Sequence, residues 1–205
     1  MKIILENIGK KFDKQWIFRQ VDRTLEKGKA YVVLGANGSG KSTFLQVVSG
    51  FVSPSEGSVI INNGNIIAQE KMFLEISCAA PYMEVYEEFT LEETLKFHQR
   101  YKPFSHPIES IINDLALPSK KAISTFSSGM KQKVKLALAL FTDCPILLLD
   151  EPTSNLDKTA KKWYLDKVNE IRKDRLLMVC SNYQKEEYEF DCEEIIIEDF
   201  KEQQN

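Results

Sequence analysis

Eight residues of this sequence have the types and the spacing that bind a chain of phosphates. Residues 35–42 read G-A-N-G-S-G-K-S, which fits the pattern G-x-x-x-x-G-K-[ST] of the phosphate-binding loop called Walker A. Glycines allow successive backbone N–H groups to turn inward around a phosphate. We expect Lys41 to reach the β- and γ-phosphates of a nucleoside triphosphate, and the Ser42 hydroxyl to hold Mg²⁺.

The segments on either side of this loop have the order that it requires. Residues 30–34 are a short apolar run, typical of a buried parallel strand. Residues 42–49 are predicted to be helical, and Gly50 stands where a glycine ends a helix. The partial positive charge at the N-terminus of that helix would attract phosphate. A chance glycine loop is therefore a poor alternative.

A second candidate for chemistry is a pair of carboxylates that follows four aliphatic residues, 146–149. Asp150 and Glu151 stand where a buried strand would end, and ligands bind at the carboxyl ends of strands in open α/β sheets. Asp150 could hold Mg²⁺, directly or through water, and Glu151 could polarise an attacking water. Such a pair is a weak signal alone, but about 110 residues after a complete phosphate loop it is a strong one.

Composition narrows the class of protein. The 205 residues suggest one domain, and they suffice to bury a sizeable core. The charge balance is 27 basic against 30 acidic residues, which gives no support for nucleic-acid binding. Four scattered cysteines without a C-x-x-C pair argue against a zinc site or a disulfide framework and favour a reducing cytoplasm. No apolar run reaches the ~18 residues of a membrane span, and an early acidic residue, Glu6, argues against a signal peptide.

The rest of the pattern alternates strands with helices, which predicts a mostly parallel sheet with helices on both faces. Strands are expected at residues 2–8, 21–26, 73–80, 176–180 and 195–197, and a β ribbon at 58–61 and 66–67. Helices are expected from Thr90, from Ser105, at 131–141 and at 158–173. Residues 88–126 are predicted to form a small helical subdomain. Lys131, Lys133 and Lys135 are interpreted as a solvated face rather than a nucleic-acid patch.

An aromatic side chain about two dozen residues before a phosphate loop could stack on an adenine ring. Phe12 and Trp16 are the candidates, in a segment between the first two predicted strands. An aromatic of the core or of a hairpin is an equally good interpretation of the residues alone.

Taken together, these motifs make the chain resemble the nucleotide-binding domain of ABC transporters over nearly its whole length. The family's LSGGQ signature corresponds to residues 126–130, F-S-S-G-M, its Walker B strand to 146–150, and its D-loop to 154–157. The resemblance implies a single domain over residues 1–205, of the α/β class. It would have a P-loop NTPase core with a mostly parallel sheet, an antiparallel β subdomain and the small helical subdomain.

The resemblance also implies the site, with ATP and Mg²⁺ as ligands. It assigns nucleotide contacts to Phe12, Gly35, Ala36, Asn37, Gly38, Ser39, Gly40, Lys41, Ser42, Thr43, Ser127 and Gly129. It assigns Mg²⁺ to Ser42 and Asp150, and catalytic roles to Glu151, Lys41 and Asn182. Two copies are expected to close head to tail, with Ser127 and the Gly129 backbone facing the γ-phosphate of the other copy. The implied partner is a separately encoded membrane permease, which would hold the protein at the cytoplasmic face of the cell membrane.

This sequence departs from the family pattern at several positions. Ser128 replaces the first glycine of the signature and Met130 replaces its glutamine. Pro81 stands where the family has a glutamine, with Tyr82 and Glu84 nearby as possible substitutes, and Asn182 stands in place of a histidine. We therefore expect tight ATP binding with slow hydrolysis. The rival hypotheses are a non-transport ABC ATPase and a nucleotide-gated dimeric switch with weak hydrolysis.

Overall fold

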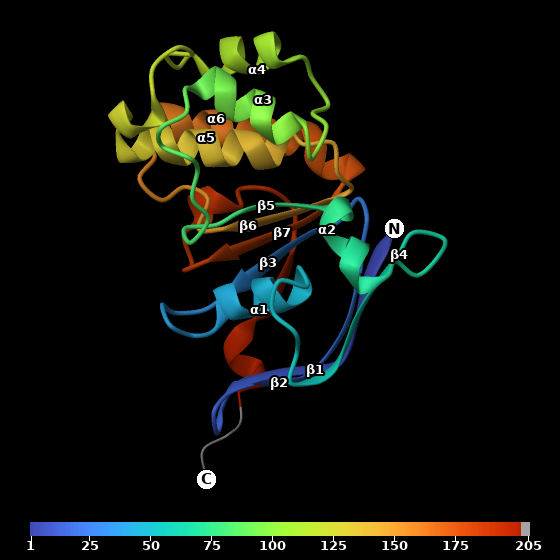
Figure 1. Cartoon of the computed structure of the whole chain (residues 1–205). Helices are drawn as coiled ribbons and strands as arrows, with labels where there is room; N and C mark the ends of the chain where they lie inside the picture. The colour runs from blue at the N-terminus through green and yellow to red at the C-terminus, as the bar shows by residue number, and fades with distance from the viewer. Residues whose placement is uncertain (202–205) are drawn as a thin grey trace.

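The computed structural model describes residues 1–201 and arranges them in layers (Figure 1). Five parallel strands form the central sheet, in the order β5 (Ile76–Ala79), β6 (Ile146–Asp150), β7 (Leu176–Ser181), β3 (Ala30–Leu34) and β8 (Glu193–Ile196). A separate antiparallel sheet has the order β2 (Gln15–Glu26), β1 (Lys2–Phe12) and β4 (Glu56–Asn62). The helix α1 (Lys41–Val48) lies between the two sheets.

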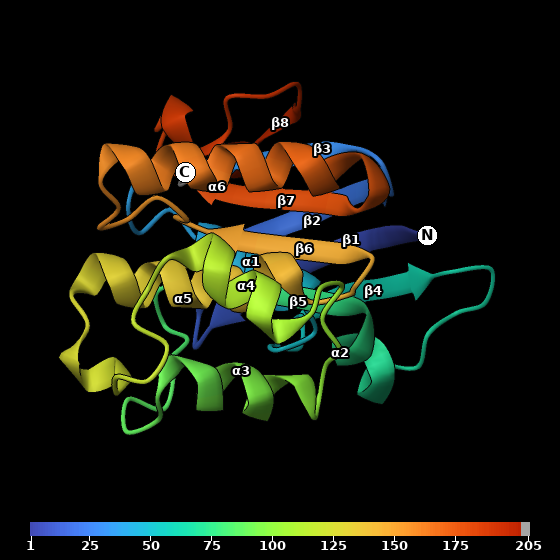
Figure 2. The same ribbon diagram turned by 90° about the horizontal axis from the view of Figure 1, so that it is seen from above.

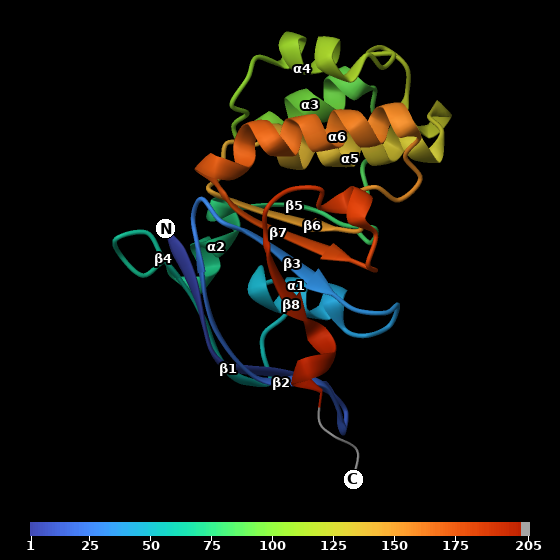
Figure 3. The same cartoon turned by 180° about the vertical axis from the view of Figure 1, so that it is seen from behind.

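Helices cover the other face of the central sheet. Figure 2 shows α5 (Ser128–Phe141) and α6 (Lys158–Ile171) lying over the strands, with α3 (Leu91–Gln99) and α4 (Ile108–Leu115) beside and above α5. A short helix, α2 (Met72–Glu75), leads into β5. Figure 3 shows β8 and the turn after it running past α1 toward the hairpin of β1 and β2. Within residues 1–201 no helix combines the length and the apolar character needed to cross a bilayer.

The central strands are buried on both faces, which explains their continuous apolar sequences. Successive side chains of a strand point to opposite faces. In β6, Ile146 and Leu148 pack with α1 and the antiparallel sheet, whereas Leu147 and Leu149 pack with α5 and α6. The register pairs Asp150 with Cys180 of β7, and Leu34 of β3 with Ser181. The carboxyl ends of β3, β6 and β7 therefore meet at one edge of the sheet.

Several predicted elements are confirmed and others are wrong in detail. The capping box of α3 is present, because Thr90 Oγ1 accepts from the Glu93 N–H and the Glu93 carboxylate accepts from the Thr90 N–H. The expected strand 73–80 is wrong at its start, since residues 72–75 are helical and only 76–79 form a strand. A short apolar run does not distinguish the two structures by periodicity.

The expected β ribbon is present only in part. Residues 56–62 form β4, which pairs with β1, and the second arm contributes an antiparallel bridge between Ile66 and Asn62 and a hydrogen bond from the Ile67 N–H to the Ile61 carbonyl oxygen (2.8 Å). The helix expected from Ser105 begins at Ile108, directly after Pro107. The helix expected at 131–141 begins earlier, at Ser128, because Ser127 caps it. The final strand ends at Ile196, one residue before the predicted end.

Candidate functional site

The phosphate loop connects β3 to α1 in a backbone conformation that requires glycine. Gly40 has φ 111°, and a Cβ atom there would lie 2.4 Å from Ile17 Cγ2. Gly40 is also the N-cap of α1 and supplies no side-chain cap, so the helix N-terminus is open to a ligand. Lys41 is only 4% exposed, and its ammonium donates to the carbonyl oxygens of Gly35 (2.9 Å) and Ala36 (3.0 Å). The loop therefore holds a positive charge among its own carbonyls.

The environment of the Asp150 carboxylate is consistent with its predicted role as a Mg²⁺ ligand. Its side chain is buried, yet neither carboxylate oxygen has a hydrogen-bond partner among residues 1–201. Burial raises the pKa of Asp150; the Ser42 hydroxyl and the Lys41 ammonium oppose that rise, although Ser42 lies outside hydrogen-bonding geometry. A buried carboxylate without donors is costly unless a cation meets it. Ser42 and Asp150 therefore form a suitable oxygen pair for Mg²⁺.

The structure brings Glu151 to the phosphate loop. A cavity of about 230 Å³ is lined by Glu151 together with Ile17, Asn37, Gly38, Gly40, Lys41, Ser42 and Thr43. The backbone of Glu151 has φ 45°, a left-handed conformation that is uncommon outside glycine. Its N–H donates to the carbonyl oxygen of Cys180 in β7 (3.0 Å). The predicted base and the predicted phosphate ligands thus share one cavity.

Phe12, rather than Trp16, is the freely exposed aromatic beside the loop. A cavity of about 600 Å³ is lined by both aromatics and by Gly38 and Ser39 of the loop. Phe12 is 51% exposed at the end of β1, with the Lys10 ammonium 5.1 Å from its ring centroid. The guanidinium of Arg19 lies 4.1 Å from the centroid of Trp16 and covers that ring. Stacking of Phe12 on adenine remains a prediction. A place in the core is excluded, whereas Phe12 does lie in the hairpin of β1 and β2, opposite Gln15.

The signature residues lie elsewhere in the chain's own fold. Ser127 Oγ accepts from the Met130 N–H (3.2 Å) as the N-cap of α5. A Cβ atom on Gly129 would lie 2.7 Å from the carbonyl oxygen of Asn155, so the loop after β6 packs directly on this glycine. Neither Ser127 nor Gly129 lines the two cavities at the phosphate loop.

Pro81, which stands where the family has a glutamine, is contacted by one of three lysines in the first half of α5. The Pro81 carbonyl oxygen accepts from Lys135 Nζ (3.4 Å), and Lys131 Nζ lies 2.6 Å from the Glu87 carboxylate. Lys133 Nζ donates to the Leu115 carbonyl oxygen (2.8 Å). These three lysines are half-buried and contact neighbouring segments, so the face of α5 that carries them is only partly solvated.

Asn182 follows β7 at the edge where the carboxyl ends of the strands meet, and it is half-buried. It is not among the residues that line the cavity of Glu151 and the phosphate loop. Its role as the substitute for a histidine stays a prediction.

Sequence reasoning missed two carboxylates that contact the site loops. Glu198 Oε1 accepts from the Ala36 N–H (3.0 Å), so one amide of the phosphate loop is bound by the segment after β8. Glu187, from the segment after β7, binds the loop that follows Glu151. Both lie in acidic stretches near the end of the sequence, where no local pattern separates a buried carboxylate from the exposed ones.

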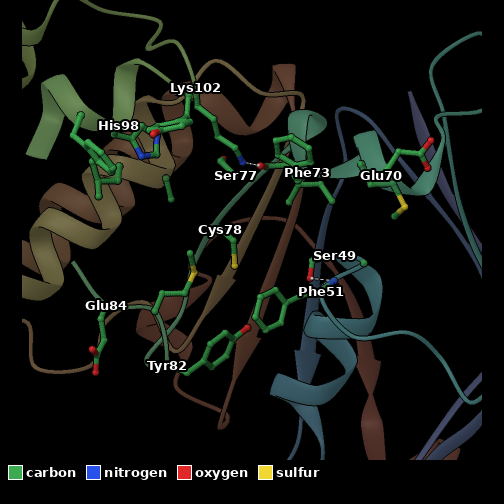
Figure 4. Close-up of a pocket in the computed structure, with 18 of the residues that line it drawn as sticks. Ser49, Phe51, Glu70, Phe73, Ser77, Cys78, Tyr82, Glu84, His98 and Lys102 are labelled. Carbon is green, nitrogen blue, oxygen red and sulfur yellow. Dashed lines mark hydrogen bonds between the residues drawn. The ribbon is translucent and has the colours of Figure 1, made fainter. Parts of the chain in front are cut away.

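It also missed a groove of about 820 Å³ between α1, α2 and the helices α3 and α5 (Figure 4). Apolar side chains dominate it, with Phe51, Phe73, Tyr82 and Tyr101 all exposed to solvent. His98 and Lys102 come from α3 and the turn after it, and the Lys102 ammonium donates to the Ile76 carbonyl oxygen. In the sequence these aromatics cannot be told from core residues.

Comparison with known proteins gives consistent similarities. The family model of ABC transporters matches residues 18–154. The linearmycin resistance ATP-binding protein LnrL of Bacillus subtilis (strain 168) is 29% identical over 203 residues, which cover 95% of this chain and 65% of LnrL. This chain thus spans about two-thirds of the length of that relative.

Solved structures share the fold. A putative ABC transporter ATP-binding protein from Pyrococcus furiosus has a TM-score of 0.83 at 23% identity, covering 98% of this chain and 100% of that one. A bacterial ABC transporter cassette solved as a dimer has a TM-score of 0.77 at 20% identity, covering 90% of each chain.

Proposed function

Because this chain belongs to the ABC transporter family as an ATP-binding subunit, we propose that it hydrolyses ATP to move a substrate through a separate membrane permease. The observation that carries the hydrolytic part is the single cavity that Glu151 shares with Lys41 and Ser42. Phosphoryl transfer needs positioning and charge stabilisation more than covalent chemistry, and these residues supply both.

Each residue of the site has a distinct role in this proposal. Lys41 leaves the carbonyls of the loop to bind the β- and γ-phosphates, and the open N-terminus of α1 adds its partial positive charge. Ser42 and Asp150 would hold Mg²⁺, which when bound supplies neutralisation of the phosphate charge. Glu151 orients the attacking water and accepts its proton. Phe12 offers a ring to the adenine.

Closure of two copies completes the site. Ser127 and Gly129 lie outside the cavities at the phosphate loop of their own chain, and their helix N-terminus is suited to a phosphate. We propose that the signature of each copy faces the ATP held by the other. A similar cassette was solved as a dimer, which is a precedent for the association of two copies of this fold.

The groove supplies a surface for the permease. Four exposed aromatic side chains in one groove are unusual on a surface without a binding partner. Lys102 and Glu70 add charged groups to the lining of the groove. We propose that an apolar segment of the permease docks there and holds the protein at the cytoplasmic face of the membrane.

Steady-state ATP hydrolysis, with ATP affinity measured by calorimetry, tests this function. We expect tight binding and slow turnover by the wild type. Glu151→Gln should lower turnover about 100-fold while ATP binding survives, because only the positioning of water is lost.

Lys41→Ala should abolish ATP binding, and Asn182→His should leave turnover equal or higher. Size-exclusion chromatography of Glu151→Gln with ATP should show a trapped dimer.

Glu170→Gln, an exposed change on α6, is the matched control and should behave as the wild type. Brisk wild-type turnover that is indifferent to Glu151→Gln would refute the assignment of the base.

A further inference from the structure

Glu187 is a buried carboxylate that none of the assigned roles uses. It ends the short turn of 3-10 helix Lys185–Glu187 after β7, and it is 1% exposed. One carboxylate oxygen accepts two hydrogen bonds from Thr153, from the backbone N–H (3.3 Å) and from the hydroxyl (3.2 Å). Thr153 is itself buried, so these bonds exclude water. Burial raises the pKa of Glu187, and the nearby Ser181 hydroxyl and both Thr153 donors oppose the rise.

Thr153 belongs to the tight turn that carries the proposed base. The Ser154 N–H donates to the carbonyl oxygen of Glu151 (3.1 Å) and closes a turn of four residues around Thr153. Within that turn the backbone of Glu151 has φ 45°. A left-handed conformation of a residue other than glycine persists only where its surroundings fix it. The two bonds to Glu187 are part of what fixes this turn.

Both ends of the Glu187 contact are anchored independently of the carboxylate. The Tyr164 hydroxyl of α6 donates to the Glu187 carbonyl oxygen (2.8 Å), so the backbone of Glu187 is held by a fully buried side chain. From the opposite side, the Gln132 amide of α5 donates to the Pro152 carbonyl oxygen (3.0 Å). The Glu187 carboxylate is therefore held in a fixed position, and it restrains the loop after β6.

We propose that Glu187 is a positioning residue that holds the loop 151–154 so that Glu151 points at the water beside the γ-phosphate. It also ties the segment that begins with Asn182 to the loop of Glu151, so the two would respond together to a bound nucleotide. The inference rests on the proposed ATPase function, because it acts through Glu151. Glu187 does not line the cavity at the phosphate loop, so we expect ATP binding not to depend on it.

Three variants test the proposal. Glu187→Leu removes the acceptor and should lower kcat about tenfold to 100-fold with KM for ATP changed less than about twofold. Glu187→Gln keeps one acceptor oxygen for Thr153 and should restore most of the loss. Thr153→Val removes only the hydroxyl and should give an intermediate loss that is not additive with Glu187→Leu. Glu186→Gln is the matched control, because Glu186 is exposed and pairs with Lys161.

Two further measurements separate positioning from a merely structural role. In the Glu151→Gln background, Glu187→Leu should cause no further loss of turnover, since its effect passes through Glu151. Amide hydrogen exchange of residues 152–155 should become at least about tenfold faster in Glu187→Leu and stay slow in Glu187→Gln. Unchanged exchange in Glu187→Leu overturns the restraint, and faster exchange with unchanged kcat overturns its role in positioning.

These outcomes are distinguishable from a failure of the proposed function. A wild type that binds but does not hydrolyse ATP contradicts the ATPase proposal and the positioning role with it, while the exchange measurement still decides whether Glu187 restrains the loop. If Glu187→Leu fails to fold, Thr153→Val and Glu187→Gln carry the same comparison.

Discussion

The ionisable side chains that matter most in this protein have their properties set by burial. Asp150 and Glu187 are carboxylates whose pKa burial raises, and His98 is a histidine whose pKa burial lowers to about 4. In each case hydrogen bonds or neighbouring charges modify the effect without being its largest cause, and for His98 the Lys102 ammonium acts in the same direction as burial. The chemistry of the single residue therefore follows from the elements around it.

His98 leads to a prediction about pH. Its Nε2 pairs with Thr142 Oγ1 (2.7 Å) and its ring stacks on Phe104, so it is held neutral in the folded protein. Between pH 6.5 and 4 the unfolded chain binds a proton at His98 that the folded chain does not bind, so stability falls as the pH falls through this window. Replacing His98 by Gln should reduce that fall by about 1 kcal/mol, because a pKa difference of one unit corresponds to about 1.4 kcal/mol before solvent screening.

Urea unfolding of the wild type and His98→Gln at pH 7 and pH 5 measures this difference. The charged groups Asp150 and Glu187 are common to both proteins and cancel in the comparison. An equal loss of stability in the two proteins would contradict the buried neutral histidine.

At the scale of elements, the helix α5 connects the parts of the molecule that nucleotide binding must coordinate. Its N-terminus carries the signature residues, and Gln132 on its first turns contacts the loop after β6. Two of its lysines contact Glu87 and the Pro81 carbonyl oxygen. The segment between these two residues contributes to the lining of the groove. One rigid helix thus links the proposed permease surface to the proposed dimer interface.

Ser127→Arg tests the position of this helix in the closed dimer. The arginine side chain is larger and positively charged. It should leave ATP binding by one copy unchanged but block closure of the dimer, and hydrolysis should fall about 100-fold. Because the change also removes the N-cap, at a cost of about 1 kcal/mol, Ser127→Asn is the control that keeps a capping oxygen. Size-exclusion chromatography with ATP gives the result, and normal dimerisation of the arginine variant would sink the proposal that the signature acts in trans.

At the scale of the whole molecule, the proposed nucleotide site and the groove lie at opposite ends of α1. The phosphate loop begins this helix, and Ser49, Gly50 and Phe51 at its other end line the groove. The most exposed aromatic of the groove is Phe51, at 78%, and its burial by a partner would be favourable. A partner seated in the groove would therefore lie at one end of the helix whose other end is proposed to bind the phosphates.

Co-expression with a candidate permease should move this chain into the membrane fraction, whereas expression alone should leave it outside that fraction. Phe51→Asp should weaken the co-fractionation about tenfold or more, since it buries a charge in the contact. Ile66→Asp is the matched control, because Ile66 is similarly exposed but lies outside the groove. Equal co-fractionation of the two variants would show that the permease binds elsewhere.

The sequence by itself determined the parts of this protein that depend on local pattern. Residue types at fixed spacing predict the phosphate loop, the carboxylates at the end of β6, the capping box of α3 and the alternation of strands and helices. Element boundaries could not be predicted where propensity was ambiguous, as in the helical residues 72–75. The pairing of β4 with β1 was not predicted either, because it joins segments far apart in the chain.

Only the tertiary structure decided the contacts between segments far apart in the chain. No local pattern marks Glu187 or Glu198 as partners of the loops after β6 and β3, because their neighbours in sequence are equally acidic. The groove has the same cause, since Phe51 and Tyr101 become one surface only when α1 and α3 are packed. Motifs depend only on residues that are close in the sequence. The burial of a carboxylate and the meeting of distant side chains in one groove depend on how the layers of the fold pack.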